Sequence, residues 1–282
     1  MLIKGVTHVA IDVISPTRVE RYLKETFGLQ SLWVGYWKGE FVRAMGSPHY
    51  QKENPALIYL HLRPDIPKAQ LNHLGFGLTT TDVDTGVAQL RERGIYVDSD
   101  GDDMLYAPED LRIQLDSFTN PRPIPTDDQA VVIKELPVDP DLPCMVRGIH
   151  HVAVDLAVPS RMIDWLCDTF EMDGRRRFAR RGELISGAFY TDAPTDPIGR
   201  RSGLLPIFKR AGLSRVRLNH IAFDVADAEG AINELEAMGE KVDLGGDAMI
   251  HGPEELWLQF DSHDTPYPVG HPANDPLIRL GD

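Results

Sequence analysis

The sequence predicts an α+β fold of four strand-helix-strand-strand-strand units, forming two tandem modules that each wrap a curved mixed sheet around a cavity. The first supporting observation is a repeat, because residues 94–117 return as residues 239–262 at a constant offset with half of the aligned positions identical. The second is that GVTHVAIDV near the N-terminus returns as GIHHVAVDL, and LNHLGFGL returns as LNHIAFDV. All four of these strand segments resemble one another, so we infer four units. The first unit matches the third and the second matches the fourth, which indicates paired modules rather than a solenoid.

Each repeated strand is followed by a pattern typical of a helix. In the first unit Ser15 and Pro16 suit the cap and first position of a helix, and Gly28 suits its end. Apolar residues then recur at helical spacing in all four units. These stripes are Val19, Tyr22, Leu23 and Phe27; Val83, Val87 and Leu90; Met162, Leu166 and Phe170; and Ala228, Ala231, Ile232 and Leu235. Short strands separated by turn residues complete each unit.

Two proline-rich segments lie outside the repeated units. Residues 120–143 contain six prolines with acidic residues between them, and only Ala130 to Ile133 have the composition of a strand. The tail after Ser262 has the same character, so we expect neither segment to carry the chemistry. The predicted organisation is an N-terminal module at 1–120, a linker at 121–146, a C-terminal module at 147–262 and a tail at 263–282.

Composition limits the partners and the setting of the protein. The net charge of −14 argues against a nucleic-acid partner, and the basic run at 175–181 is expected to be a solvated strand edge. Cys144 and Cys167 are too few for a disulfide framework or a cysteine-based zinc site. No apolar run approaches membrane-spanning length, and a strand pattern begins at Leu2 without a signal peptide. We therefore expect a cytoplasmic protein that binds a small-molecule substrate, with a homodimer as an option and no nucleic-acid or membrane partner.

Strand alternation predicts which side chains share a face. His8 lies on the face opposite Val9 and Ile11, which should pack under the helix. The same rule separates the other repeated His and Gln side chains from their apolar neighbours. The six polar residues expected to point into the two cavities are His8, His73, Gln114, His151, His220 and Gln259. Small residues beside each His leave room for a ligand.

Paired units with His on the first strand of each, and a polar residue on the last strand of the second, resemble the vicinal oxygen chelate superfamily. This superfamily includes glyoxalase I, methylmalonyl-CoA epimerase, fosfomycin and bleomycin resistance proteins and extradiol ring-cleaving dioxygenases. The resemblance covers the chain from Leu2 to about Ser262, and two tandem modules look most like the extradiol dioxygenases, whose iron sits in the C-terminal module on two His and one Glu. Carried over by position, it implies the metal ligands His151, His220 and Gln259, with an equivalent N-terminal set of His8, His73 and Gln114.

The sequence departs from the extradiol pattern. Gln replaces Glu in both modules, and a neutral amide oxygen is a weaker ligand for a hard ion than carboxylate, although Gln is a ligand in the glyoxalase and epimerase branches. The extradiol acid/base His has no counterpart in the C-terminal segment 204–212. The catalytic candidates are His61, Tyr106 and His251, and the substrate-binding candidates are Tyr59, Arg112 and Trp257. Arg112 against Trp257 is the main asymmetry between the two sites.

The remaining polar residues are expected to have structural roles. His49, His150, His263 and His271 lie off the repeated positions and are expected at the surface. Asp12 and Asp155 are expected to cap the helices that follow them. For the six His and Gln side chains, the alternative to metal binding is that they hydrogen-bond one another inside a polar cavity.

Three functions follow from the resemblance. The leading interpretation is a ring-cleaving, extradiol-like dioxygenase in which Fe(II) holds vicinal oxygens of the substrate and O2. The second is a glyoxalase- or epimerase-like lyase or isomerase that works through a metal-stabilised enediolate, and Mn, Zn, Ni or Co are alternatives to Fe(II). The third is a metal-free protein that binds a small molecule, as resistance proteins of this fold do.

Overall fold

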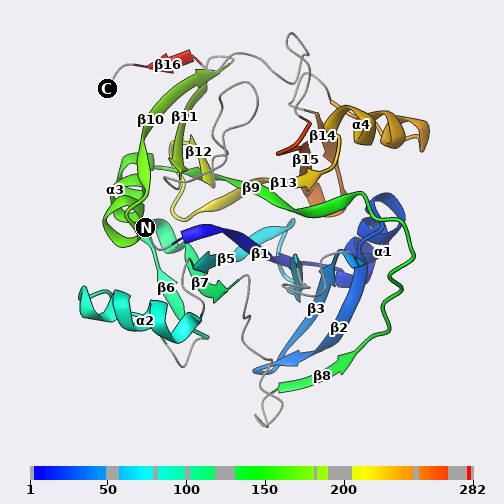
Figure 1. The fold of residues 1–282 in the computed structure, drawn as a ribbon, viewed down its shortest axis with the longest axis horizontal. Coiled ribbons are helices and arrows are strands. Elements are labelled where there is room, and N and C mark those ends of the chain that lie inside the picture. The colour runs from blue at the N-terminus through cyan, green and yellow to red at the C-terminus, as the bar shows by residue number, and fades with distance from the viewer. Residues whose placement is uncertain are drawn as a thin grey trace.

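The computed structural model describes residues 3–48, 57–78, 82–98, 102–117, 131–180, 183–189, 205–243, 248–265 and 278–280. These residues form two modules of the same design, each built on one eight-stranded mixed sheet with helices packed against it (Figure 1). The predicted α+β fold of two tandem modules is confirmed. In Figure 1 the N-terminal module occupies the lower half of the molecule and the C-terminal module the upper half.

The N-terminal sheet joins its two units along their first strands. Its elements are β1 Ile3–Val13, α1 Pro16–Phe27, β2 Gln30–Trp37, β3 Glu40–Gly46, β4 Ile58–Leu62, β5 Gln70–Leu78, α2 Val83–Glu92, β6 Met104–Tyr106, η2 Pro108–Asp110, β7 Arg112–Ser117 and β8 Val131–Glu135. The strand order is β6-β7-β5-β1-β4-β3-β2-β8. Strand β1 pairs antiparallel with β5 and parallel with β4, so the centre of the sheet is made by both units.

The C-terminal sheet repeats this topology. Its elements are β9 Val146–Leu156, α3 Pro159–Phe170, β10 Asp173–Arg180, β11 Glu183–Phe189, β12 Leu205–Lys209, β13 Arg217–Val225, α4 Ala228–Ala237, β14 Met249–His251, η4 Pro253–Glu255, β15 Trp257–Asp261 and β16 Ile278–Leu280. The strand order is β14-β15-β13-β9-β12-β11-β10-β16. Every strand therefore has a counterpart at the same place in the other module.

Two details of the predicted units differ in the structure. The short strand expected before β6 is reduced to one bridge between Asp98 and Met104, and the C-terminal module has the same single bridge. Asp102 and Asp103 both have positive φ, so the backbone turns there instead of extending the ladder. The proline-rich segments are also less irregular than expected, because β8 pairs with β2 and β16 pairs with β10 at the sheet edges.

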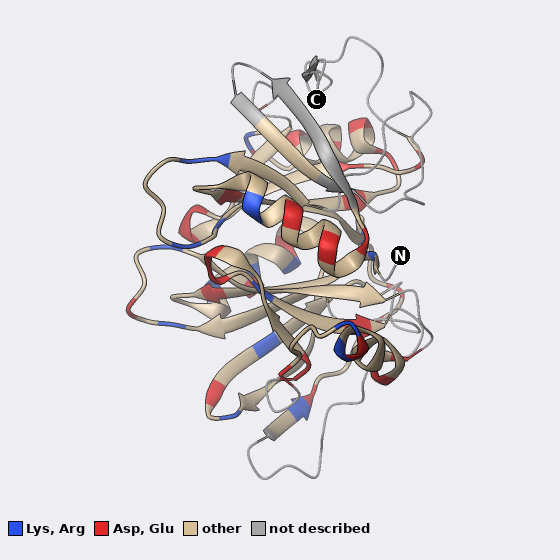
Figure 2. Ribbon diagram, turned by 90° about the vertical axis from the view of Figure 1, so that its left-hand side faces the viewer, with Lys and Arg blue, Asp and Glu red and all other residues tan. Residues whose placement is uncertain are grey.

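The apolar faces of the two modules share one core. Phe27 at the end of α1 packs against Phe223 of the C-terminal sheet, with ring centroids 5.6 Å apart. In the symmetry-related contact Phe170 at the end of α3 packs against Phe76, at 5.7 Å. Strands β1 and β9 run beside each other through the middle of the molecule (Figure 1), and Figure 2 shows the two modules stacked. Burial of these rings fixes the modules to each other, since each aromatic side chain removes a large apolar area from water.

Each module caps a helix of the other. The Glu254 carboxylate accepts the backbone N–H groups of Ile14 at 2.7 Å and Ser15 at 2.9 Å, just before α1. Glu109 accepts the N–H groups of residues 157 and 158 before α3, both at 2.8 Å. The prediction that Asp12 and Asp155 cap these helices is wrong, because carboxylates from the opposite module occupy that place. Pro16 does begin α1, and Gly28 ends it with φ of 75°.

We expect loss of either inter-module cap to lower stability. Glu109→Gln and Glu254→Gln remove a negative charge from a helix N-terminus, so each should lower the free energy of unfolding by about 1 kcal/mol. The matched control is Glu255→Gln, because Glu255 makes only a surface ion pair with Lys68 among its described contacts. Chemical denaturation of the three variants checks this. Equal stability of Glu254→Gln and Glu255→Gln would contradict the capping role.

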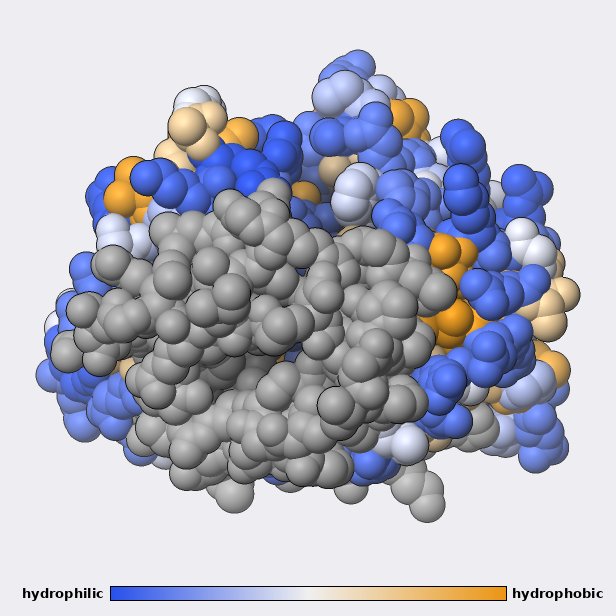
Figure 3. All heavy atoms as spheres, turned by 90° about the horizontal axis from the view of Figure 1, so that it is seen from above, coloured by the Kyte–Doolittle hydropathy of each residue, from blue (hydrophilic) through white to orange (hydrophobic). Residues whose placement is uncertain are grey.

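The face of the molecule seen in Figure 3 is mostly hydrophilic outside the grey region. In the view of Figure 3, hydrophobic atoms outside the grey region form small separate patches among hydrophilic ones. Among the described residues, no helix combines the length and apolar character needed to cross a membrane.

Candidate active site

Strand register brings the three N-terminal candidates for metal ligands together. His8 on β1 lies opposite Gly75 on β5, and Gly75 lies opposite Gln114 on β7. The Nε2 atom of His8 is 3.3 Å from Nε2 of His73 and 3.1 Å from Oε1 of Gln114. Two imidazole nitrogens and one amide oxygen therefore converge on one point of the inner face.

A chain of side chains fixes the proton of His73. Asn72 donates an N–H to Asp12 Oδ1 at 2.7 Å, so its amide oxygen faces His73 Nδ1 at 3.0 Å. An amide oxygen only accepts, so Nδ1 of His73 must carry its proton. The Nε2 atom of His73 then presents a lone pair to the other two donors, as in metal-bound imidazoles whose second nitrogen is held by an outer partner.

Asp116 and Thr7 lie beside the Nδ1 atom of His8. The Asp116 carboxylate lies 3.5 Å from His8 Nδ1, and the Thr7 hydroxyl lies 3.1 Å from the same nitrogen. Burial opposes the ionisation of Asp116, but its contacts with His8, Thr7 and the backbone of Ser117 outweigh this effect and hold the pKa of Asp116 below its usual range. A negative charge beside Nδ1 favours the N–H there, which leaves the lone pair of His8 on Nε2.

The resulting donor set fits a divalent cation. With both imidazole protons on Nδ1, three lone pairs point at one another, an arrangement that is repulsive unless a positive charge lies among them. Two ligand atoms about 2.1 Å from an ion at ordinary coordination angles are about 3.0 to 3.4 Å apart. The separations of 3.1 and 3.3 Å match that spacing. Imidazole nitrogens and an amide oxygen suit Fe(II), Mn(II), Co(II), Ni(II) and Zn(II).

The expected room beside His8 is taken by His8 itself. A Cβ atom added to Gly75 would lie 2.2 Å from Cε1 of His8 and 2.5 Å from the Thr7 hydroxyl. The glycine therefore lets the imidazole lie against the backbone of β5, and it does not leave a space for a ligand as we expected from the sequence.

Tyr59 and His61 stand beside the donors on the neighbouring strand β4. The ring of Tyr59 meets His8 edge-on at 4.7 Å, and the ring of His61 is 6.0 Å from that of His73. Burial raises the pKa of the Tyr59 phenol, with Asp116 adding to the effect, so the phenol stays protonated. Burial lowers the pKa of His61, although the charges of Asp12 and Glu40 partly oppose this. His61 is therefore a neutral imidazole at neutral pH.

The surroundings of His61 suit a proton acceptor. Its Nδ1 lies 3.5 Å from Oε2 of Glu40, and among the described residues this nitrogen has no hydrogen-bond partner. Glu40 in turn pairs with Arg63 at 2.5 Å. The negative charge of Glu40 stabilises the imidazolium that forms when His61 takes up a proton.

The remaining candidates lie at the rim. Arg112 is half-buried, and its Nε donates to the backbone oxygen of Asn72 at 3.2 Å. Tyr106 is 54% exposed and its hydroxyl donates to Asp98 at 3.0 Å. In the C-terminal module His251 and Trp257 are exposed and pack on each other with ring centroids 4.5 Å apart. None of the three aromatic rings has a described contact with the central His pair of its module.

The C-terminal module keeps the His pair and its outer partners. Nε2 of His151 lies 3.1 Å from Nε2 of His220. Asn219 binds His220 Nδ1 at 2.8 Å and donates to Asp155 at 2.8 Å, as Asn72 and Asp12 do in the N-terminal module. The recurring Asp residues of β1 and β9 thus hold the Asn that orients a His.

Around this pair the C-terminal module differs. The amide nitrogen of Gln259 donates to Asp261 at 3.3 Å. Phe208 takes the register position of His61, because it pairs with Asp155 as His61 pairs with Asp12. Pro206 stands where Tyr59 stands in the N-terminal module. The equivalent described strand of the C-terminal module therefore has no counterpart of His61 or Tyr59 with a similar side chain.

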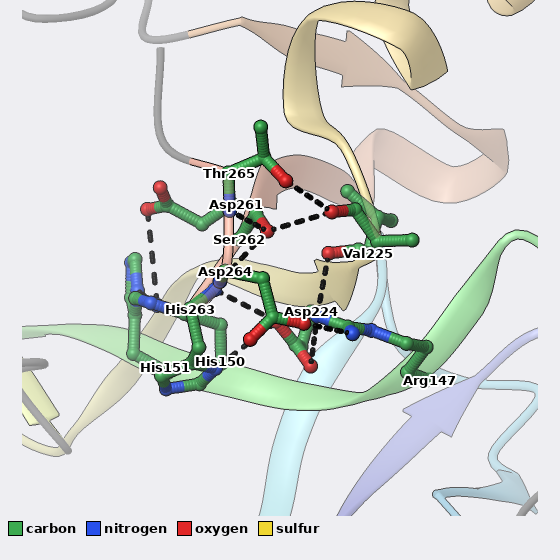
Figure 4. A network of polar contacts seen from close by, with 11 residues as sticks. Arg147, His150, His151, Asp224, Val225, Asp261, Ser262, His263, Asp264 and Thr265 are labelled. Carbon is green, nitrogen blue, oxygen red and sulfur yellow. Dashed lines mark hydrogen bonds and ion pairs between the residues drawn. The ribbon is translucent and has the colours of Figure 1, made fainter. Parts of the chain in front are cut away.

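The prediction that His150 and His263 are surface residues is wrong. Nδ1 of His150 lies 2.9 Å from Nδ1 of His151 and 3.8 Å from Asp261, and its ring packs on His263 at 4.3 Å. His263 binds Asp224 at 3.0 Å (Figure 4). Neither residue lies at a repeated position, so the repeat carries no signal for either of them. His49 and His271 lie outside the described residues.

The buried imidazoles predict how stability depends on pH. Burial, together with the charges of His8, His61 and Arg112, lowers the pKa of His73 well below its ordinary value. The unfolded chain then binds more protons than the folded chain below about pH 6.5. We expect the free energy of unfolding of the metal-free protein to fall as pH drops below about 6.5, and His73→Asn to show a shallower fall. Denaturation series from pH 7.5 to 5 measure both slopes, and an increase in stability on acidification would contradict this assignment.

Comparison with known proteins identifies the fold. No family model and no curated protein sequence matches the chain. Among solved structures, a mutant of 4-hydroxymandelate synthase from Streptomyces coelicolor is 14% identical, with 96% of each chain covered and a TM-score of 0.64. The 2,3-dioxygenase LapB from Pseudomonas sp. KL28 is 11% identical, with 95% of each chain covered and a TM-score of 0.63. The Mn(II)-bound glyoxalase from Novosphingobium aromaticivorans is 11% identical, covering 96% of this chain and 90% of its own, with a TM-score of 0.60.

Proposed function

We propose, from the premise that the chain has the vicinal oxygen chelate fold, that it is a divalent-metal-dependent enzyme with its active centre in the N-terminal module. The substrate is a small molecule with two adjacent oxygen atoms. The observation that carries this proposal is that one module combines three convergent donors, His8, His73 and Gln114, with the neutral imidazole of His61. The other module has Phe208 at the position of His61.

The N-terminal donors would hold the ion. When bound, a divalent cation supplies Lewis acidity toward adjacent oxygens of the substrate. His8 and His73 are oriented for this by Asp116 and Asn72, which hold the Nδ1 protons away from the site. The donor set is neutral because Gln114 stands where a carboxylate would cancel part of the positive charge.

The surrounding residues support proton transfer. His61 accepts a proton from a carbon or hydroxyl next to the substrate oxygens, and Glu40 stabilises the imidazolium that results. The same imidazolium then returns the proton at a neighbouring atom, so the step is balanced without an external acid. Tyr59 remains a phenol and offers a hydrogen-bond donor on the same face. We therefore favour isomerase or lyase chemistry.

An apolar wall borders this centre and indicates the nature of the substrate body. Trp33, Val42 and Ala44 form a small buried cluster against which Tyr59 and Trp37 pack. The ring of Trp33 lies 5.7 Å from that of Tyr59, which itself contacts His8. A substrate with an apolar or aromatic body next to its two oxygens suits such a wall.

Ring cleavage is the second candidate. The tandem architecture shared over 95% of each chain with the dioxygenase LapB favours it. The donor set disfavours ring cleavage, because non-haem Fe(II) oxygenases use two His and a carboxylate, and Gln114 is neutral. His61 serves either chemistry as an acid or base.

An oxygen electrode and deuterium exchange decide between the two candidates. The protein is purified anaerobically, loaded with Fe(II) or Mn(II), and given catechols or 2-hydroxycarbonyl compounds in D2O. We expect deuterium incorporation without O2 uptake. O2 uptake that matches the loss of a catechol would establish ring cleavage and overturn the proton-transfer proposal. Inactivity of His151→Ala with full activity of His8→Ala would overturn the choice of module.

A further inference from the structure

We propose that the C-terminal module has a second site for a divalent cation, formed by Nδ1 of His150, Nδ1 of His151 and the carboxylate of Asp261. The site is separate from the N-terminal centre and does not depend on the proposed function. It also differs from the ligand set that the resemblance implies for this module, because neither His220 nor Gln259 belongs to it. Its ligand is a cation that favours imidazole, such as Zn(II), Ni(II) or Cu(II).

A β-bulge brings two consecutive histidines together. On a regular strand, neighbouring side chains point to opposite faces of the sheet. His151 on β9 lies opposite Ala222 on β13. The next pair joins Ile149 to Phe223, which leaves His150 as the extra residue of a bulge. Because the bulge interrupts the alternation, His150 Nδ1 lies only 2.9 Å from His151 Nδ1.

The N-terminal module has the same bulge with a different residue in it. Thr7 is the extra residue between the paired Val6 and His8, and its hydroxyl lies 3.1 Å from His8 Nδ1. A threonine hydroxyl is not among the usual ligands of Zn(II), which are thiolates, imidazoles and carboxylates. The backbone feature is therefore repeated in both modules, whereas the second imidazole, that of His150, is peculiar to the C-terminal one.

The third donor comes from the end of β15. Oδ2 of Asp261 lies 3.8 Å from His150 Nδ1, and the three donor atoms all lie within 4.8 Å of one another (Figure 4). Two ligand atoms about 2.1 Å from one ion are about 3.0 Å apart at a right angle and about 4.2 Å apart on a straight line. The separations of 2.9 and 3.8 Å are close to or within this range.

Charge and neighbouring side chains suit a cation at this place. Asp261 supplies a carboxylate, so the donor set of two imidazoles and one carboxylate offsets part of the charge of the ion. The amide nitrogen of Gln259 donates to Asp261 Oδ2 at 3.3 Å, and the ring of His263 packs on His150 at 4.3 Å. These outer contacts hold two of the ligands in place. His151 is buried and the other two ligands are partly buried, which leaves a route from solvent.

The other nitrogen of His151 faces His220, at 3.1 Å between the two Nε2 atoms. The two nitrogens of an imidazole point in divergent directions, so an ion at Nδ1 of His151 does not lie between His151 and His220. The two positions can be told apart by which variant loses the ion. A hydrogen bond between His150 and His151 without any cation is the remaining alternative, and it predicts that no ion depends on His150.

Zinc counting on single variants tests the inference. Each chain is dialysed against a chelator buffer that fixes free Zn(II) and suppresses weak surface binding, and bound zinc is measured by atomic absorption, with circular dichroism as the check of folding. We expect two ions in the wild type and one in His150→Thr, which introduces the residue type of the N-terminal bulge. Asp261→Asn should weaken binding of the same ion by about 10-fold or more. His220→Phe, which keeps a ring without a nitrogen, should retain both ions, and His8→Ala should lose only the N-terminal one.

The outcomes separate this inference from the proposed function. Two ions in His150→Thr would overturn the inference, and so would loss of an ion in His220→Phe, which would place that ion between His151 and His220. A single wild-type ion that His8→Ala removes would overturn the inference and leave the proposed function intact. A single ion that His8→Ala retains and His150→Thr loses would support the inference and overturn the proposed function. If His150→Thr does not fold, unchanged zinc affinity in Asp261→Asn would overturn the inference. No bound ion in the wild type would overturn both.

Discussion

His61→Asn is expected to lower kcat by about 10² to 10⁴-fold while leaving the bound ion in place. The magnitude is that of a general acid or base, and Asn keeps the polar character of the position without a titratable nitrogen. His61 makes no described hydrogen bond to the donors, so ion content should not change. Turnover and bound metal are measured on the same preparation.

The two modules supply the control for this experiment. Phe208 occupies the register position of His61 in the C-terminal sheet, so Phe208→Leu should leave kcat within about two-fold of the wild type. A kcat for His61→Asn that is also near that of the wild type would show that another group carries the proton. Loss of the ion in His61→Asn would instead make His61 a ligand.

Gln114→Leu is expected to lower the affinity for the ion by more than about 100-fold. Loss of a residue that only holds a ligand in place costs roughly 10- to 100-fold in affinity, and loss of a ligand should cost more. The reason is that the Gln114 amide oxygen is one of the three convergent donors, 3.1 Å from His8 Nε2. Leu has a similar size and no donor atom. Isothermal titration with Mn(II) gives the affinity, and Gln259→Leu is the matched control with unchanged stoichiometry.

A structural role for Gln114 predicts a different result. If the amide only pairs with the imidazoles, Gln114→Leu should bind the ion as the wild type does and lose about 1 to 3 kcal/mol of stability from unpaired buried groups. Gln114→Glu provides a second test, because added negative charge should tighten ion binding if the side chain is a ligand. If Gln114→Leu and Gln114→Glu both bind Mn(II) with the affinity of the wild type, Gln114 is not a ligand and the three-donor interpretation is wrong.

Strand alternation was sufficient to bring His8, His73 and Gln114 together on one face, and His151 and His220 on the equivalent face. Strand alternation has a period of two, so His8 and His73 had to share a face once β1 and β5 were paired. The repeat then carried the same assignment to His151 and His220. These predictions depend on local geometry and on the pairing of repeated strands, which are properties that a single sequence records.

The outer partners were visible in the sequence but misinterpreted. The Asn of each LNH segment and the Asp at the end of each first strand recur in both modules. Asp12 was expected to cap a helix, because Asp at a strand end before a helix is typical of a cap. The structure gives the cap to Glu254 of the other module, which leaves Asp12 to hold Asn72. A contact between modules leaves no local signal in the sequence.

The crowding beside His8 could not be predicted, because it depends on where one ring lies in the folded module. Gly75 and Ala222 differ by one methyl group, and both fit the pattern of a small residue beside a His. Only the position of the His8 ring shows that this methyl group would collide with it. The orientation of His73 follows from its contact with Asn72, and Asn72 is held by Asp12, which becomes its neighbour only in the folded chain.

Anomalous X-ray diffraction from crystals equilibrated with Mn(II) tests the central claim most directly. The account predicts one strong peak in the N-terminal module, within about 2.0 to 2.6 Å of His8 Nε2, His73 Nε2 and Gln114 Oε1. A peak at His151 and His220 alone, or a peak that touches neither His pair, would contradict the account.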